Sequence, residues 1–384
     1  MRVLRGITWD HPRGFDCLAG ALPEFHRDHP DIKVTWTKRS LRDFGEAPID
    51  DLAEKFDLIV VDHPFCGRAA ATGCLLNLEP LLGKPAIDAF VADAVGPSAI
   101  SYHYKDGVWA LPTDAAAQVC SYRPDLLEAI GMEVPSTWQE VVTLARVARE
   151  AGKWVMLPAV PIDAICSFLT LTANLGHALK DDDVDFIETA VVEHALAMLG
   201  EIIAIAHPAS LKLNPIQAYE LMTNSDDIVY VPLAFGYSNY ARGEGSPRLR
   251  FGNIAGPGKD PSAGSILGGA GCAITKACEH VSAAITYLQY VHAPSHQRGL
   301  YFDCGGQPGS RSAWTDSRTN ASCANFFKDT LGTLDKAYLR PRFDGFIPFF
   351  EDAGRTINSF LRNDISARST VQRLRSSYEG ARIQ

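Results

Sequence analysis

Two patterns of hydrophobic residues, one typical of strands and one of helices, alternate along this chain. Residues 56–61 (FDLIVV) are almost continuously apolar, which is typical of a strand buried on both faces. Residues 277–292 carry apolar side chains every three or four positions, which predicts an amphipathic helix. Such strand and helix signals alternate through most of the chain, and from about Ser310 the signal is helical to the end. The pattern predicts an α/β fold with mostly parallel sheets.

Individual elements follow from the same pattern. We expect strands over 3–10, 32–37, 56–61, 118–122, 154–158, 227–232 and 267–274. Residues 111–114 (LPTD) read as a polar turn before the strand 118–122. A helix begins near Ser136, which has Gln139 at capping-box spacing, and it ends at Gly152.

Length and charge exclude several classes of protein. A chain of 384 residues exceeds the roughly 250–300 residues at which single cores stop growing, so we expect two lobes. The net charge of −9 argues against a nucleic-acid partner, which needs a basic stripe. No apolar run reaches the roughly 18 residues of a membrane span.

The cysteines and the N-terminal sequence indicate the cellular compartment in which the protein is expected. Nine cysteines form no CxxC pair, and no HExxH occurs, so the sequence predicts neither a disulfide framework nor a zinc site. Scattered thiols are typical of a reducing compartment. No leader precedes the first strand, so the chain as written is expected in the cytoplasm; a leader absent from this sequence would instead place it in the periplasm.

Five segments in order resemble one family. They are the opening strand, helix and HPDIKVTW; 56–82 with its turn ATGCLLNLEPLL; WALPTDAAAQVCSYRPDLLEAIGMEVPSTWQEV (109–141); IVYVPLAFGYSNYARG (228–243); and 265–314 with SILGGAGCAI and GGQPGS. Together they resemble the bacterial solute-binding proteins of family 1, the sugar-binding type, which capture ligands for ABC importers. The segment 109–141 carries the resemblance most strongly, because in that family the chain passes there from one lobe to the other.

The resemblance implies a periplasmic-binding-protein-like fold of type II, with two α/β lobes, a ligand cleft and a hinge. The first lobe would comprise 1–112 plus 260–308, and the second 113–259 plus 309–384. It also implies a small-molecule ligand, no cofactor, no metal, a monomer, and an ABC permease as partner if the protein is exported.

Polar and aromatic residues at strand ends are candidates for ligand contact, because ligands of open α/β sheets bind beyond the carboxyl ends of strands. The candidates are Trp9, Asp10, His11, Asp62, His63, Asp114, Phe235, Tyr237, Asn239, Gly269 and Arg340. Aromatic faces suit the apolar side of a sugar ring, and carboxylates or amides suit its hydroxyl pairs. Asp114 and Tyr237 are supported mainly by the resemblance.

Each candidate has a plainer interpretation. Trp9 could serve packing alone, and Asp10 and Asp62 could form Asx turns that cap the next helix. Gly269 lies in a glycine run (268–271) that is not a P-loop; it either allows close strand crossing or presents backbone N–H groups. Arg340 could pair with surface carboxylates or, as a fork, bind an acidic ligand.

Two functions compete at this stage. The first is a non-catalytic binding protein for a carbohydrate, polyol or sugar acid. The second is a cytosolic sensor or an acid–base enzyme of the dehydratase or isomerase type, in which His11 or His63 works with Asp114 or a neighbouring aspartate. We favour binding without turnover.

Overall fold

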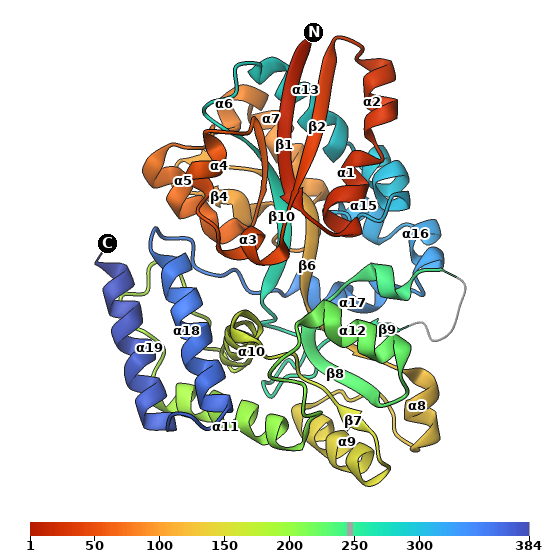
Figure 1. The fold of residues 1–384 in the computed structure, drawn as a ribbon, viewed down its shortest axis with the longest axis vertical. Helices are drawn as coiled ribbons and strands as arrows, with labels where there is room; N and C mark the ends of the chain where they lie inside the picture. The colour runs from red at the N-terminus through yellow and green to blue at the C-terminus, as the bar shows by residue number, and fades with distance from the viewer. Residues whose placement is uncertain (244–248, 384) are drawn as a thin grey trace. The chain divides into compact units, whose positions relative to one another are not determined.

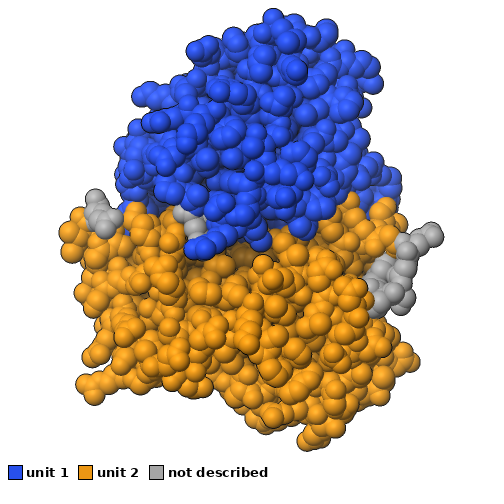
Figure 2. All heavy atoms as spheres, viewed as in Figure 1, with its two compact units in different colours: residues 1–115, 268–319, 342–344 blue, residues 116–267, 320–341, 345–384 orange. Residues whose placement is uncertain are grey.

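The chain divides into two compact units. The computed structural model describes residues 1–243 and 249–383. Unit 1 comprises Met1–Ala115, Gly268–Thr319 and Arg342–Asp344, and unit 2 comprises Ala116–Leu267, Asn320–Pro341 and Gly345–Gln384 (Figure 2). Residues 260–267 thus belong to unit 2 rather than to the predicted first lobe, and 309–319 and 342–344 belong to unit 1.

Local hydrogen bonds explain these boundaries. Ser310 Oγ donates to the Asp93 carboxylate, and Arg318 donates to Asp303 at 2.6 Å, which holds 309–319 on unit 1. In unit 2, Ser265 Oγ donates to the carbonyl of Gln118 at 2.5 Å. The division therefore follows side-chain contacts that the hydrophobic pattern does not report.

Unit 1 is built around a four-stranded arrangement in the order β2-β1-β3-β10 (Figure 1). Its elements are β1 (Arg2–Trp9), α1 (Cys17–Ala19), α2 (Leu22–Asp28), β2 (Ile32–Arg39), α3 (Leu41–Glu46), α4 (Ile49–Ala53), β3 (Leu58–Val61), α5 (Cys66–Thr72), α6 (Glu79–Leu82), α7 (Lys84–Asp93), β4 (His103–Tyr104), β5 (Gly107–Val108), most of β10 (Leu267–Ile274), α13 (Val281–His292), α14 (Pro294–His296), α15 (Arg311–Trp314) and the first part of α16 (Ser317–Ser322). The strand β1 pairs in parallel with β2 and β3, whereas β10 runs antiparallel to β3.

The core of unit 1 lies on this sheet. Residues 58–61 (LIVV) are buried at every position, as expected for a strand covered on both faces. The helix α13 adds Tyr287 and Leu288, neither of which is exposed to solvent. Tyr287 accepts a hydrogen bond from Trp36 Nε1 at 2.8 Å, so the core also fixes the polar atom of a half-buried indole.

Unit 2 combines a short sheet with a larger share of helix. The strand β6 (Leu111–Tyr122) begins in unit 1 and continues from Ala116 in unit 2. The other elements of unit 2 are α8 (Pro124–Ala129), α9 (Trp138–Glu150), β7 (Trp154–Val155), α10 (Pro161–Asn174), α11 (Thr189–Ile205), α12 (Pro215–Asn224), β8 (Ile228–Phe235), β9 (Arg250–Gly252), α17 (Phe326–Asp335), α18 (Phe346–Leu361) and α19 (Ala367–Arg382). The strand β8 pairs antiparallel with β6 and parallel with β7, and β9 pairs with β6. The helix α18 packs against both α10 and α19 (Figure 1).

Three expectations are corrected by these elements. Residues 111–114 are not a turn: they begin the continuous strand β6, which is buried from Leu111 to Ser121. The sheets are mixed rather than mostly parallel, because β6 and β10 run antiparallel to their neighbours β8 and β3. The capping box of α9 is formed by Thr137 and Glu140, one residue later than predicted.

Within 1–243 and 249–383, no helix combines the length and apolarity needed to cross a bilayer.

The packing of α18 on α10 can be tested at Gly354. A Cβ at this position would lie 2.5 Å from the carbonyl oxygen of Pro161, the first residue of α10. We expect Gly354→Ala to lower the free energy of unfolding by about 1–3 kcal/mol through overpacking. Urea denaturation measures the change.

Gly200→Ala is the matched control. Gly200 lies inside α11, and its Cβ would meet only the ring of Phe360, at 3.9 Å. Since alanine has the higher helix propensity, this variant should gain up to about 1 kcal/mol. Equal effects of the two substitutions would contradict the close contact between α18 and α10.

Candidate functional site

The carboxyl ends of three strands gather polar residues at one edge of the unit 1 sheet. The parallel strands β1, β2 and β3 end there: Asp10 follows β1, Lys38 and Arg39 are the last two residues of β2, and Asp62 follows β3. The antiparallel strand β10 begins at the same edge. The residues predicted at the ends of β1 and β3 therefore lie at the same edge of this sheet in unit 1. They are Trp9, Asp10, His11, Asp62 and His63.

Asp114 forms a buried ion pair with Arg13 in unit 1. The guanidinium donates through Nε and Nη2 to the two carboxylate oxygens, both at 2.6 Å. Arg13 is 4% exposed and Asp114 is 2% exposed. Burial raises the pKa of Asp114, and the charge and hydrogen bonds of Arg13 act against that rise. The two-pronged geometry fixes both side chains and leaves neither as an isolated charge.

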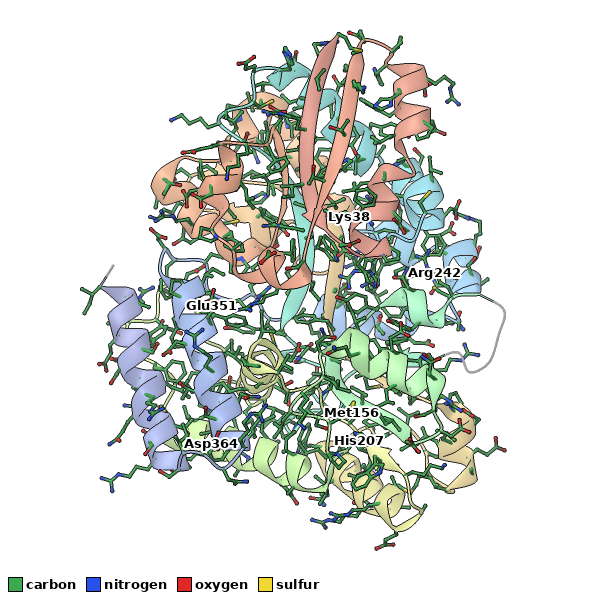
Figure 3. The ribbon with its side chains drawn as sticks, viewed as in Figure 1. Lys38, Met156, His207, Arg242, Glu351 and Asp364 are labelled. Atoms are coloured by element: carbon green, nitrogen blue, oxygen red, sulfur yellow. The ribbon has the colours of Figure 1, made fainter. Side chains whose placement is uncertain are left out.

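Two further carboxylates at this edge also have polar partners. Asp10 Oδ1 lies 2.8 Å from Lys38 Nζ in an exposed pair; Figure 3 labels Lys38. Asp62 Oδ1 accepts from the backbone N–H of His63 at 2.8 Å, and it lies 3.1 Å from His63 Nδ1. Asp62 thus makes the turn contact that its place before a short helix suggests, and its charge still acts on Asp114.

His11 is held in its neutral form. Burial, and then the charge of Arg13, lower its pKa to about 4, while Asp10 acts in the opposite direction. Its Nδ1 accepts from the backbone N–H of Arg13 at 3.1 Å. A histidine with this pKa is neutral near pH 7 and cannot serve there as a general acid.

Trp9 is mainly a packing residue with one unmatched polar atom. Its ring lies 4.8 Å from that of Phe44, and a Cβ on Gly14 would come within 2.3 Å of the indole. Trp9 is 4% exposed, and its buried Nε1 makes no hydrogen bond with the described residues.

Gly269 has a positive φ of 107° and lies against the strand β6. A Cβ there would meet the carbonyl oxygen of Asp114 at 2.5 Å and Cα of Ala115 at 2.9 Å. Of the two interpretations of the glycine run, the structure gives close backbone crossing a clear physical basis.

In unit 2, three predicted residues lie at or just beyond the end of β8. Phe235 ends the strand, and its carbonyl accepts from Tyr219 Oη at 2.9 Å. Tyr237 is 7% exposed and meets the Tyr219 ring edge-on at 6.3 Å, and Asn239 lies in the next helical turn. Tyr219 therefore links this edge to α12.

Arg340 is buried in unit 2, with 4% exposure, and its guanidinium lies 5.5 Å from the centre of the Phe350 ring. Arg342 belongs to unit 1, where it donates to the carbonyl of His103 at 2.7 Å and to two neighbouring carbonyls. Neither arginine is a simple surface residue.

Asp163 is a residue that strand-end reasoning missed. It lies in the first turn of α10 in unit 2 and is 5% exposed. Burial alone raises its pKa to about 8. A sequence signal existed: Asp163 is the only Asp, Glu, Lys or Arg within the otherwise apolar stretch 155–179. Lys38 was missed as well, although it lies at a predicted strand end.

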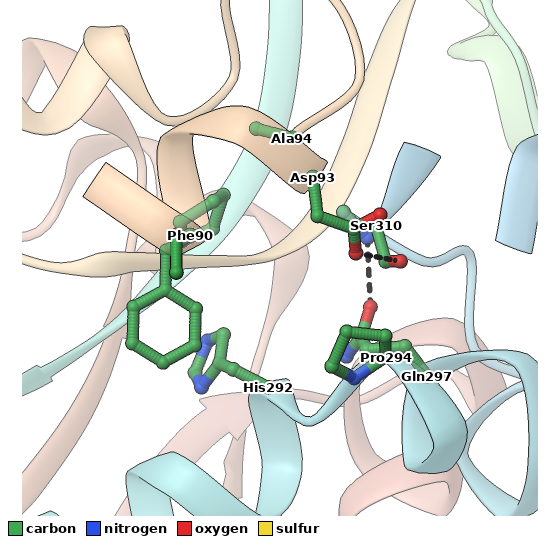
Figure 4. Close-up of a pocket in the computed structure, with 10 residues that line it drawn as sticks. Phe90, Asp93, Ala94, His292, Pro294, Gln297 and Ser310 are labelled. Atoms are coloured by element: carbon green, nitrogen blue, oxygen red, sulfur yellow. Dashed lines mark hydrogen bonds between the residues drawn. The ribbon is translucent and has the colours of Figure 1, made fainter. Parts of the chain in front are cut away.

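Unit 1 also contains a cavity of about 100 Å³ away from the predicted residues (Figure 4). Phe90, Pro112 and Pro294 supply apolar walls, and His292 lies edge-on to Phe90 at 6.0 Å. His292 is locked by its neighbours: Nδ1 lies 2.7 Å from the carbonyl of Leu288, and Nε2 lies 2.9 Å from Thr113 Oγ1.

Among residues 1–243 and 249–383, no three His, Cys, Asp or Glu side chains are grouped as a metal ion would require.

The buried pair yields a stability prediction. Asp114→Ala leaves the Arg13 guanidinium buried without its carboxylate, so we expect a loss of about 3–5 kcal/mol in the free energy of unfolding. Asp28→Ala removes the exposed partner of Arg27 and should cost less than about 1 kcal/mol. Urea denaturation compares the two; similar small losses would mean that Arg13 is solvated in solution.

The chain is similar to several binding proteins of known ligand. The chain is similar to the mannitol-binding protein of Pseudomonas aeruginosa, with 30% identity over 122 residues; this match covers 30% of the chain and only 27% of that protein's length. Among solved structures, maltose-bound MalE3 of T. maritima matches with a TM-score of 0.83 and 17% identity, over 99% of both chains.

Two other structures carry polyols. The ABC transporter solute-binding protein of Agrobacterium radiobacter K84 in complex with ribitol has a TM-score of 0.80 and 18% identity, over 99% of this chain and 98% of that one. The solute-binding protein of Agrobacterium vitis S4 with bound D-mannitol has a TM-score of 0.78 and 14% identity, with the same coverage. These likenesses confirm the predicted type II periplasmic-binding-protein fold. The model of the bacterial extracellular solute-binding protein family matches residues 16–298, and the chain belongs to that family.

Proposed function

We propose that this protein captures a polyol or a closely related sugar and delivers it to an ABC permease, without chemical turnover. The observation that carries the proposal is membership of the solute-binding family together with the likeness to proteins named for, or solved with, mannitol and ribitol. Because its pKa is about 4, His11 is neutral at pH 7 and does not fit the general acid that the dehydratase or isomerase alternative needs, which supports binding.

The charges of unit 1 support a neutral ligand over a sugar acid. Arg13 and Lys38 each pair with a carboxylate, and Arg39 donates to the carbonyls of Val60 and Asp43. An acidic ligand would have to compete with Asp114 or Asp10 for these cations. Hydroxyl groups, which both donate and accept, can add to the existing pairs without breaking them.

The cysteines are compatible with this function. None of the nine, all of which lie in the described residues, forms a disulfide, and only Cys74 and Cys304 are more than marginally accessible. Burial raises the pKa of Cys120 and of Cys272 to about 12, so these thiols stay protonated. Since the thiolate is the reactive form, an oxidising compartment would leave most of them unchanged.

Ligand capture is tested by thermal melting and calorimetry with D-mannitol, ribitol, D-tagatose, maltose and D-gluconate. We expect at least one polyol or sugar to raise Tm, because ligand at 100 times its Kd adds about 2.7 kcal/mol to stability. Proton NMR of the mixture over hours should show no product. Binding of gluconate alone, or new product signals, would contradict the proposal.

Asp10 gives a residue-level test. Its pair with Lys38 is exposed, so Asp10→Asn should leave the unliganded Tm nearly unchanged. If Asp10 accepts a ligand hydroxyl, losing the charge weakens binding by about 1.5–3 kcal/mol, or roughly tenfold or more. Asp88→Asn, which breaks the exposed pair with Lys84 on α7, is the control and should bind as the parent does. Equal affinity of all three proteins would remove Asp10 from the site.

A further inference from the structure

Asp163 is a buried carboxyl group without a protein partner. Its Oδ2 is fully buried, and the side chain makes no hydrogen bond or ion pair with the residues described in 1–243 and 249–383. Buried polar groups in folded proteins are nearly always hydrogen-bonded, and each exception needs a reason. Asp163 differs in this from Asp10, Asp62 and Asp114, all of which have partners.

The surroundings of Asp163 belong to the ligand-facing elements predicted for unit 2. On the same helix, Ser167 and Thr170 are hydrogen-bonded to the Gln118 side chain of β6, at 3.1 and 2.6 Å. Gln118 lies opposite Phe235, the last residue of β8. Asp163 also acts electrostatically on Tyr219, whose hydroxyl bonds the Phe235 carbonyl. Asp163 thus lies on the helix α10, which contacts β8 and is hydrogen-bonded to β6.

Among residues 1–243 and 249–383, no cationic side chain forms an ion pair with Asp163. The two strands, Ala116–Tyr122 of β6 and all of β8, contain no Asp, Glu, Lys or Arg. Titratable side chains on Asp163's own helix and the elements packed against it are Cys166, Tyr230 of β8, Glu193, His194 and Glu201 of α11, and Glu351, Asp352 and Arg355 of α18. None of these contributes to the pKa of Asp163, which burial alone raises to about 8. In α18, Arg355 lies beside Glu351 and Asp352, at 3.8 and 3.7 Å.

We propose that Asp163 is a ligand-binding carboxylate of unit 2 that accepts hydrogen bonds from two adjacent hydroxyl groups of a polyol. This inference rests on the proposed function and names a residue that carries its specificity. A carboxylate has two oxygens that match two vicinal hydroxyls, whereas an ammonium group offers three N–H donors and needs further acceptors. The two hydroxyls replace the water that burial has removed from the carboxylate.

Binding of this kind is coupled to proton release. With a pKa of about 8, Asp163 is mostly protonated at pH 7 before the ligand arrives, whereas hydroxyl donors favour the ionised form. Affinity should therefore rise with pH, by up to about tenfold per unit, and level off above about pH 8. At pH 7, close to one proton should leave the protein for each ligand bound.

The test is titration calorimetry of the full chain with D-mannitol and ribitol at pH 6, 7 and 8, in phosphate and in Tris. The two buffers differ in ionisation enthalpy, so the difference in heat counts released protons. We expect Asp163→Asn to lower affinity at pH 8 at least about tenfold, to lose the pH dependence and to release no proton. Asp185→Asn, an exposed acid of unit 2, should behave as the parent.

The outcomes separate the two proposals. Asp163→Asn should melt no lower than the parent without ligand, because it removes an unpaired buried acid; weak binding then reflects the lost contact rather than misfolding. Parent-like affinity and proton release in Asp163→Asn would overturn the role of Asp163 and leave polyol capture intact. Preference of the parent protein for an amine such as glucosamine over every polyol would also overturn it. If the parent binds no sugar or polyol at all, the proposed function itself fails.

Discussion

Close backbone packing in unit 1, where the chain leaves it, is the constraint on which the rest depends. A Cβ on Gly309 would lie 2.2 Å from the carbonyl oxygen of Pro112, and one on Gly269 would lie 2.5 Å from that of Asp114. The same segments exchange backbone hydrogen bonds, from Ala115 to Gln307 and from Gly309 to Thr113, both at 3.2 Å. Because only glycine fits, the register of β6 is fixed, and Asp114 is held where Arg13 reaches it.

That fixed register makes the polar edge of unit 1 a preformed one. Arg13 and Asp114 are buried together with two short hydrogen bonds, so neither charge has to lose bound water when a ligand binds. Asp62 is held by the backbone of His63. A site whose side chains are already fixed loses less conformational entropy on binding, which favours affinity without additional contacts.

Sequence reasoning found what depends on local order and missed what depends on distant contacts. The apolar runs located β3, β8 and β10, and the strand-end rule located Asp10 and Asp62, because both signals need only neighbouring residues. Pro112 was read as a turn residue, yet it lies near the start of β6, where full burial erases the alternating pattern. The partner of Asp114 lies 101 residues away, and no local rule could name it. Asp163 was missed because it lies at the start of a helix.

The buried carboxyl groups of Asp114 in unit 1 and Asp163 in unit 2 are stabilised in different ways. Asp114 keeps a permanent cation, whereas Asp163 has none within the described part of the chain and lowers the cost of its burial by taking up a proton, as its pKa of about 8 indicates. An acid that is neutral until donors arrive costs unit 2 less than a permanent unpaired charge would. Once ionised against hydroxyls, however, it penalises any ligand that lacks them, because the carboxylate is then left unsatisfied. Discrimination by Asp163 therefore arises from the penalty for the wrong ligand more than from attraction to the right one.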